Sequence, residues 1–190
     1  TESQRQDAIA TSLASSNANI RALFLRFLPP DQRPRTLGPA IDADALLKLT
    51  GNPERGAEIL SPTGKWAACY ACHTIHGSGG KIGPDLSKVG SRLDKAQILE
   101  SLASPSKAIA PEFQAWQIES SDGKVETGFI TKQSKSDTTF TLADGTTRTI
   151  TKADIKKQIP LAISLMPEGL LQTLTPQEAA DVLAWLASLK

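Results

Sequence analysis

The sequence predicts a mostly α-helical protein with a small antiparallel β-meander as an insertion and a helical extension at its N-terminus. Capping residues followed by apolar residues at helical spacing mark several helix starts. Between Gln114 and Ile150 the chain instead becomes rich in Thr, Ile, Val and Phe, and Asp-Gly pairs punctuate it, which is typical of hairpins. We therefore expect residues 1–41 to form a helix and linker. Residues 42–190 are expected to form one domain with a strand-rich insertion at about 112–160.

The N-terminal extension is expected to be helical over residues 1–28. Ser16 or Asn17 could cap a helix whose apolar face includes Ile20, Leu23, Phe24 and Phe27. Pro29 and Pro30 end this helix, and residues 29–41 have the proline and glycine content of an extended linker. We interpret this part as a packing appendage.

Two helix starts open the domain itself. Asp42 is expected to cap a short helix that runs to Leu49. Asn52 is expected to cap a second helix, with Pro53 at its first position, where the missing N–H costs nothing. The second helix runs towards the only two cysteines of the chain.

Two further helices are expected later in the chain. Asp94 caps the first of them, whose apolar face comprises Ile98, Leu99 and Leu102. The closing helix runs to Leu189 and begins with a cap, a first-turn proline and a reciprocal carboxylate, namely Thr175, Pro176 and Glu178.

Strands are expected between these helices. The alternating stretches are residues 115–121, 125–133, 138–142 and 146–150. The pairs Asp122-Gly123 and Asp144-Gly145 supply two of the turns. Residues 152–158 are expected to be weakly helical.

The strongest functional signal is the run C-Y-A-C-H at residues 69–73, the attachment signature of c-type haem. Cys69 and Cys72 can add to the two vinyl groups of one haem, and His73 can place an imidazole beneath the iron. The alternatives are a redox dithiol, half of a zinc site and a disulfide. No βαβ pattern surrounds the run, two Cys and two His make a poor four-ligand zinc set, and so short a disulfide loop would stabilise little.

A second axial ligand is needed if the iron is to shuttle electrons, and the choice lies between His76 and Met166. His76 follows His73 too closely to reach the opposite face of the ring, so we interpret it as a solvated loop residue. Met166 is the only methionine and stands before a proline, well separated from His73 in sequence. A core gap-filler is its alternative role. A glycine-rich loop, residues 77–86, permits either tight turns or close approach to something flat.

Composition narrows the class of protein. With 21 basic and 20 acidic side chains the net charge is +1, which argues against binding to nucleic acid. No apolar stretch has the length of a membrane span. No signal-peptide pattern opens the chain, yet haem is attached to this motif outside the cytoplasm in bacteria. We therefore expect a periplasmic or otherwise exported chain, either mature or cut from a longer protein.

With these parts in place, the sequence resembles the class I cytochrome c family. More narrowly, it is similar to the haem-binding domain at the C-terminal end of large exported proteins of planctomycetes and verrucomicrobia. The segments that carry this resemblance are FLRFLPPDQRPRTLG, CYACHTIHGSGGKIGPDLSKVGSRL, LASPSKAIAPEF and SLMPEGLLQTLTPQEAADVLAWL. It covers most of the chain from Phe24 onwards, and the inserted strands depart from ordinary small cytochromes.

The resemblance implies a cytochrome c-like helical haem domain with one covalent haem c. The implied cofactor-binding residues are Cys69, Cys72, His73, Pro84, Arg92 and Met166. Of these, His73 and Met166 would be the iron ligands, and the Pro84 carbonyl would accept a hydrogen bond from His73. Arg92 would pair with a propionate, although a solvated surface Arg is an equal alternative. Gly56 would let its helix cross the closing helix near Trp185.

The implied function is single-electron transfer, not catalysis, in exchange with a redox partner such as an exported dehydrogenase to which the domain could itself belong. The alternative is a haem enzyme or gas sensor with an open or displaceable distal site. A further interpretation is that the inserted strands dock the haem domain onto a partner.

Overall fold

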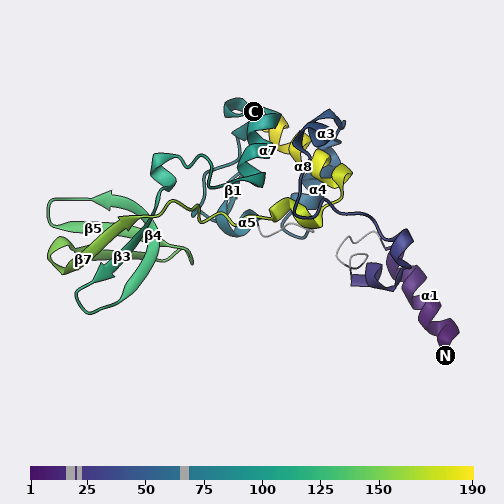
Figure 1. The fold of residues 1–190 in the computed structure, drawn as a ribbon, viewed down its shortest axis with the longest axis horizontal. Helices are drawn as coiled ribbons and strands as arrows, with labels where there is room; N and C mark the ends of the chain where they lie inside the picture. The colour runs from purple at the N-terminus through teal and green to yellow at the C-terminus, as the bar shows by residue number, and fades with distance from the viewer. Residues whose placement is uncertain (16–19, 21–22, 65–68) are drawn as a thin grey trace. The chain divides into compact units, whose positions relative to one another are not determined.

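The computed structural model describes residues 1–15, 20, 23–64 and 69–190, and the chain folds as two compact units (Figure 1). The first unit comprises residues 1–69 and 171–188, and the second comprises residues 70–170 and 189–190. The first is helical, whereas the second combines short helices with a β-sheet.

The N-terminal segment of the first unit differs from the single helix that the sequence predicts. Helix α1 (Glu2–Leu13) is capped by Thr1 in a capping box with Gln4, and none of its residues is buried. Two 3₁₀ turns follow, η1 (Leu25–Phe27) and η2 (Pro30–Gln32). The predicted caps Ser16 and Asn17 lie outside the described residues.

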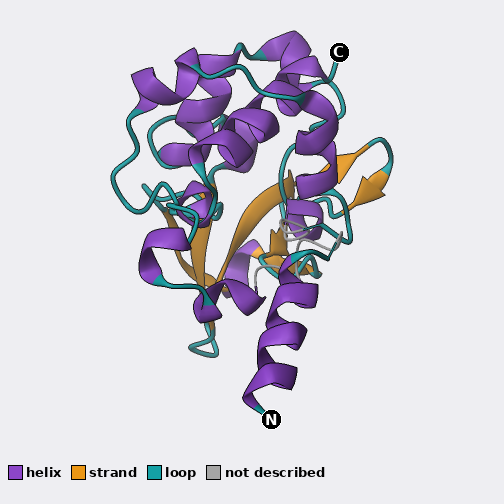
Figure 2. Cartoon of the chain, turned by 90° about the vertical axis from the view of Figure 1, so that its right-hand side faces the viewer, coloured by secondary structure: helices purple, strands orange, loops and turns teal. Residues whose placement is uncertain are grey.

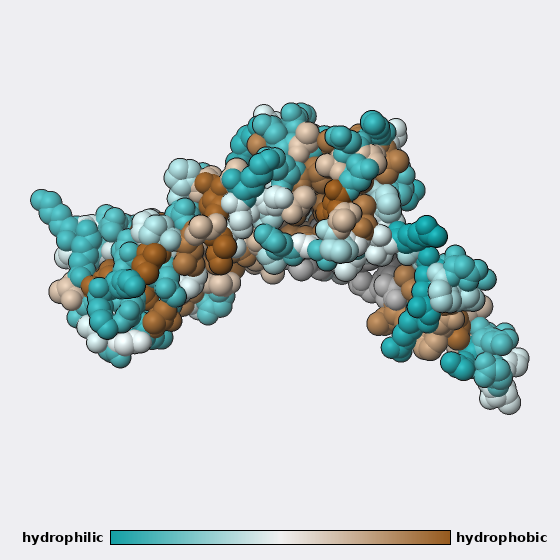
Figure 3. Space-filling model, viewed as in Figure 1, coloured by the Kyte–Doolittle hydropathy of each residue, from teal (hydrophilic) through white to brown (hydrophobic). Residues whose placement is uncertain are grey.

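Three apolar residues of this segment stay exposed, namely Ile20, Leu23 and Phe27. Hydrophobic side chains are accordingly visible on its surface (Figure 3). The chain that follows is tied to the rest of the unit by backbone hydrogen bonds. Leu37 donates to Leu174 at 2.8 Å, and Gly38 donates to Gln172 at 3.1 Å.

The helices of the first unit that follow this segment begin where the capping residues predict. The Asp42 side chain caps α3 (Ala43–Lys48), and Asn52 caps α4 (Pro53–Leu60). After the 3₁₀ turn η5 (Leu170–Thr173), helix α8 spans Pro176–Ser188. Its start is closed by Thr175, whose N–H donates to Glu178 at 2.8 Å and whose hydroxyl accepts from the Glu178 N–H.

Helices α4 and α8 form the main packing contact of this unit. A Cβ atom at Gly56 would collide with the Asp181 carbonyl group and lie 2.8 Å from the Trp185 Cβ, which confirms the expected close crossing. The fully buried Asp181 carboxylate accepts from the Asn52 N–H at 2.8 Å and pairs with Arg55 at 3.1 Å. A buried carboxylate therefore ties α8 to the start of α4.

The helical part of the second unit starts at Tyr70, within α5 (Cys69–Cys72), whose first residue belongs to the first unit. It then contains a two-strand hairpin of β1 (Thr74–Ile75) and β2 (Ser78–Gly79), followed by α6 (Val89–Arg92) and α7 (Lys95–Ala103). Asp94 caps α7 in a capping box with Gln97, as predicted. The predicted apolar face of α7 is buried: Ile98, Leu99 and Leu102.

The rest of the second unit is a five-stranded antiparallel sheet (Figures 1 and 2). It follows a 3₁₀ turn, η3 (Pro111–Phe113). The strands are β3 (Ala115–Ser120), β4 (Val125–Gln133), β5 (Asp137–Leu142), β6 (Thr147–Thr151) and β7 (Ile155–Pro160), in the order β6-β5-β4-β3-β7. Gly123 and Gly145 have positive φ angles of 85° and 82°, so both Asp-Gly pairs form the predicted turns.

Two expectations are corrected by this sheet. Residues 152–158 are not a helix, because Lys152–Asp154 form a 3₁₀ turn (η4) and the chain then enters β7, which pairs with β3. The fold is also not mostly α-helical. With 42% of residues helical and 20% in strands, a sheet of this size makes the chain a mixed α and β protein.

Candidate functional site

The first four residues of the C-Y-A-C-H run form a single turn of helix. Cys69 and Cys72 are the first and last residues of α5, and both are half-buried. Residues three apart are neighbours on a helix surface, so the two thiols share one side of the turn. They are not joined in a disulfide. This arrangement lets both sulfurs react with the same partner molecule.

His73 follows this turn, and its ring is oriented by a backbone carbonyl. Nδ1 of His73 lies 2.8 Å from the Pro84 oxygen. A carbonyl oxygen can only accept, so Nδ1 carries the hydrogen of the neutral ring and the lone pair is on Nε2. An imidazole whose second nitrogen is held in this way is typical of metal-binding histidines. The contact is the one that the family resemblance implies.

The His73 ring explains why the residue before Pro84 is a glycine. A Cβ atom at Gly83 would lie 2.5 Å from Cε1, 2.7 Å from Nδ1 and 3.1 Å from Nε2 of the His73 ring. The Gly83 N–H donates to the Cys72 carbonyl at 2.7 Å. The flat group that the glycine-rich loop approaches is therefore the His73 imidazole. It lies so close to the backbone that residue 83 has no room for a side chain.

The rest of the loop folds back on the same turn of helix. Gly80 donates to the Tyr70 carbonyl at 2.7 Å, and a Cβ atom at Gly80 would collide with the Ala71 carbonyl oxygen. The β1–β2 hairpin turns at His76 and Gly77, whose φ angles are 50° and 80°. His76 is exposed, as expected of a loop residue.

Arg92 lies beside the segment that follows Pro84. Its Nη2 donates to the Asp85 carbonyl at 2.6 Å. Hydrogen bonds from Ser87, helped by the positive charge of Arg92, hold the pKa of the Asp85 carboxyl below its ordinary value. With Lys88, these residues line a hollow of about 350 Å³. An anionic group could be accepted here by the two cationic side chains.

Met166 lies in the loop of residues 161–169, which joins β7 to the start of η5. Its side chain is half-buried. Its backbone N–H donates to the Ser164 hydroxyl at 3.1 Å, and the Ser164 N–H donates to the Ser106 hydroxyl at 3.1 Å. The pairing of Met166 with His73 across an iron stays a prediction.

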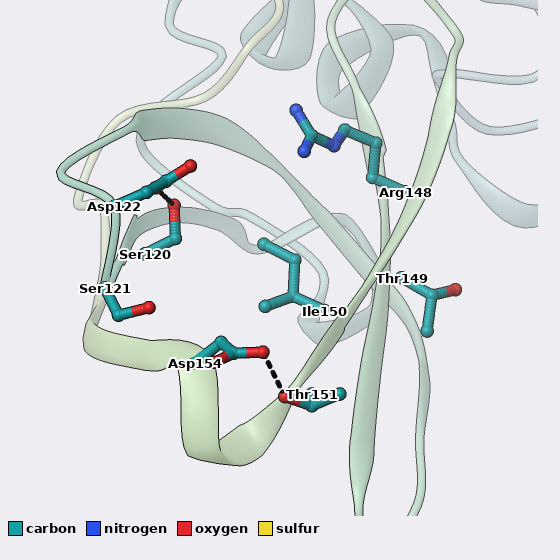
Figure 4. A pocket seen from close by; sticks show the side chains of 8 residues that line it. All are labelled: Ser120, Ser121, Asp122, Arg148, Thr149, Ile150, Thr151 and Asp154. Carbon is teal, nitrogen blue, oxygen red and sulfur yellow. Dashed lines mark hydrogen bonds between the residues drawn. The ribbon is translucent and has the colours of Figure 1, made fainter.

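The sheet carries a second hollow, which the sequence did not predict (Figure 4). Its volume is about 300 Å³, and its lining comes from β3, the turn after it, β6 and η4: Ser120, Ser121, Asp122, Arg148, Thr149, Ile150, Thr151 and Asp154. The one signal for this region in the sequence was the predicted turn at Asp122-Gly123. Lining groups bond to one another, since Ser120 donates to Asp122 and Thr151 donates to Asp154, each at 2.6 Å.

The donor chemistry around α5 is that of a c-type haem site. Two thiols one turn apart and an imidazole with its Nε2 lone pair available match the groups that covalent haem requires. No cluster of three or more His, Cys, Asp or Glu that could hold a metal ion occurs in the described part of the chain, so a zinc site has no ligand set there. Of the helices in that part, none is both long and apolar enough to cross a membrane.

Comparison with known proteins agrees with this chemistry. A family model described as Cytochrome c matches residues 54–190, which is more than half of the chain. The match includes α4 from its second residue, the cysteine turn, the sheet and α8. Among curated proteins, the comparison finds no relative of the chain.

Proposed function

We propose that this chain, which belongs to the cytochrome c family, carries single electrons through one haem c with His73 and Met166 as axial ligands. Family membership establishes the coarser part, a covalently bound haem c and a role in electron transfer. The single haem, its ligands and its redox partner are the proposal.

Cys69 and Cys72 would hold the haem through thioether bonds. When bound, the haem supplies a one-electron iron couple. The observation that carries the proposal is the 2.8 Å contact between His73 Nδ1 and the Pro84 carbonyl. It keeps the proton on Nδ1 and presents Nε2 as the ligand, and Gly83 lets the backbone lie against the ring.

Met166 is the preferred ligand for the opposite face of the iron. It is the only methionine, and its half-buried side chain lies in a hydrogen-bonded loop. A soft thioether favours ferrous iron and so raises the reduction potential relative to a second imidazole. Arg92 is the proposed propionate partner. Its guanidinium has five N–H groups, and the contact with Asp85 uses one of them.

The finer setting is also proposed. Residues 42–190 form the cytochrome domain, with the strands of about 112–160 as its insertion and residues 1–41 as its N-terminal extension. The insertion stands between α7 and the Met166 loop, which supports the narrower resemblance to planctomycete and verrucomicrobial domains. Because haem attachment to such motifs takes place outside the bacterial cytoplasm, we propose an exported domain that exchanges electrons with a dehydrogenase.

Spectra of the holoprotein test the ligand set. The protein is first exported and matured by a c-type haem attachment system. We expect the reduced protein to show the sharp α-band of a low-spin c-type haem. The ferric protein should show the near-infrared methionine–iron band, and Met166→Ala should lose that band and bind CO when reduced while it keeps the covalent haem. A wild-type protein that lacks the band, or that binds CO rapidly, would instead favour a haem enzyme or gas sensor.

A further inference from the structure

We infer that Ser106 and Ser164 are positioning residues that hold the Met166 loop in place, which would make the strength of methionine ligation depend on two serine hydroxyls. The inference rests on the proposed role of Met166 as an iron ligand. It concerns residues of the second unit only, and the two serines stand on either side of the strand-rich insertion in the sequence.

The Met166 loop has little packing of its own. None of residues 161–169 is buried, and the Ile163 side chain is 60% exposed. Few buried apolar contacts and an exposed backbone are the marks of a segment with low local stability. Polar contacts must therefore supply much of what keeps the loop in one conformation.

The anchor of the loop is a turn at the end of α7. Lys107 donates to the Ser104 carbonyl at 3.0 Å, and Pro105, at the position that turns favour for proline, is buried. Lys107 also pairs with Glu100 of α7. Ser106 thus projects its hydroxyl from a turn that is fixed on both sides.

Two hydrogen bonds lead from this anchor to the methionine. The Ser106 hydroxyl accepts from the Ser164 N–H at 3.1 Å. The Ser164 hydroxyl accepts from the Met166 N–H at 3.1 Å, which is the two-residue turn that serines stabilise with their own side chains. Removing either hydroxyl leaves a half-buried N–H without its acceptor and frees the backbone of the ligand residue.

The end of the sheet gives the loop its starting point. The Leu161 N–H donates to the Ala115 carbonyl at 2.8 Å, and the Gln114 side chain donates to the Leu161 carbonyl at 2.6 Å. These bonds close the neck where the chain enters β3 and leaves β7. Beyond Leu161, the hydrogen bond from Ser164 to Ser106 ties the chain to the turn after α7.

The test compares the holoproteins of Ser106→Ala and Ser164→Ala with the wild type. One neutral hydrogen bond corresponds to about a fivefold change in an equilibrium, so we expect each variant to bind CO about fivefold more tightly when reduced. The near-infrared methionine–iron band should be weaker than in the wild type. The α-band and covalent haem should be unchanged.

Two variants control for a general loss of stability. Ser106→Thr keeps the hydroxyl and should restore wild-type CO affinity. Ser101→Ala removes a hydroxyl within α7 that donates to the Gln97 carbonyl, and it should leave the band and CO affinity unchanged. If the wild type shows the band but both alanine variants match it in band and CO affinity, the inference is overturned. A wild type without the band overturns Met166 ligation, and this inference with it.

Discussion

At the scale of single residues, the shape of the site depends on a glycine against an imidazole. Gly83 has its backbone on the face of His73, and Pro84 receives the hydrogen bond from that ring. These two adjacent residues therefore set both the plane and the tautomer of one side chain. The hydrogen bond also increases the electron-donating strength of the ring nitrogen opposite to it.

We expect Gly83→Ala to disturb this arrangement. The added Cβ would need space that the ring occupies, and such overpacking lowers the free energy of unfolding by about 1–3 kcal/mol. A displaced ring would lose its bond to Pro84 and donate less to the iron, so the reduction potential should rise. Urea unfolding and a redox titration of the holoprotein would measure the two effects.

Gly77→Asn is the matched control for that variant. Gly77 has a φ of 80° with open space around it, and asparagine tolerates this region better than most residues. Its unfolding midpoint and potential should stay at wild-type values. Wild-type stability and potential in Gly83→Ala would contradict the role assigned to the close contact.

At the scale of elements, cap and turn residues predicted three helix starts and two turns of the five-stranded sheet. Asp42, Asn52 and Asp94 cap the helices they were expected to cap, since an N-cap is a contact within four residues of chain. Strand β7 was mistaken for a helix because its local pattern is weak. Its conformation comes from pairing with β3, for example Gln158 with Ile118, about forty residues away.

The two Asp-Gly turns of the sheet are expected to weaken in acid. Asp144 accepts from the hydroxyl of Thr146 at 2.6 Å and from its N–H at 2.8 Å, and these bonds hold the pKa of the Asp144 carboxyl below its ordinary value. A carboxyl whose folded pKa is lowered contributes stability above its unfolded pKa and loses it as the pH falls through the folded value. Hydrogen exchange should show the Thr146 amide protected at neutral pH and losing that protection as the pH falls below the ordinary range of an aspartate pKa.

Asp144→Asn should keep the acceptor and remove the titration. In that variant the Thr146 amide should stay protected in acid. The Lys124 amide, which donates a hydrogen bond to Asp122 in the other turn, should still lose protection. The pKa of Asp122 is lowered by hydrogen bonds from Ser120 and Lys124 in the same way. Equal acid sensitivity of Thr146 in the variant and the wild type would count against the carboxylate as its cause.

At the scale of the whole molecule, the structure defines where the sheet can be removed. Because the Gln114 side chain donates to the Leu161 carbonyl at 2.6 Å, the two ends of the cut lie close together, and a short glycine linker can replace residues 115–160. We expect this variant to attach haem and keep the near-infrared band, since Ser106 and Ser164 remain. Loss of the edge-to-face contact of Phe113 with Phe129 should cost about 1 kcal/mol in unfolding free energy.

A deletion of residues 114–150 provides the contrast. It would remove β3 and leave β7 without the strand it pairs with, so an unpaired edge would invite aggregation. We expect a low yield of monomer by size-exclusion chromatography, with intact absorption spectra only for the 115–160 replacement. If that replacement also failed to attach haem, the sheet would be required for the cytochrome fold and would not be a separable insertion.

The sequence by itself determined the chemistry. The run from Cys69 to His73, the single methionine and the helix caps depend on residue identity and short spacing, so they were readable without a structure. The family match over residues 54–190 agrees with the haem and electron-transfer part of that interpretation. The liganding role of Met166 is still a prediction.

Only the tertiary structure decided how much of the chain is sheet, where the insertion closes and what the glycines approach. Strand β7, the Gln114–Leu161 neck and the contact of Gly83 with His73 each join residues that a local pattern does not relate. The Ser106–Ser164 bond spans 58 residues in the same way. Such contacts arise from the packing of the folded chain as a whole, whereas caps, turns and the haem motif are written in a few neighbouring residues.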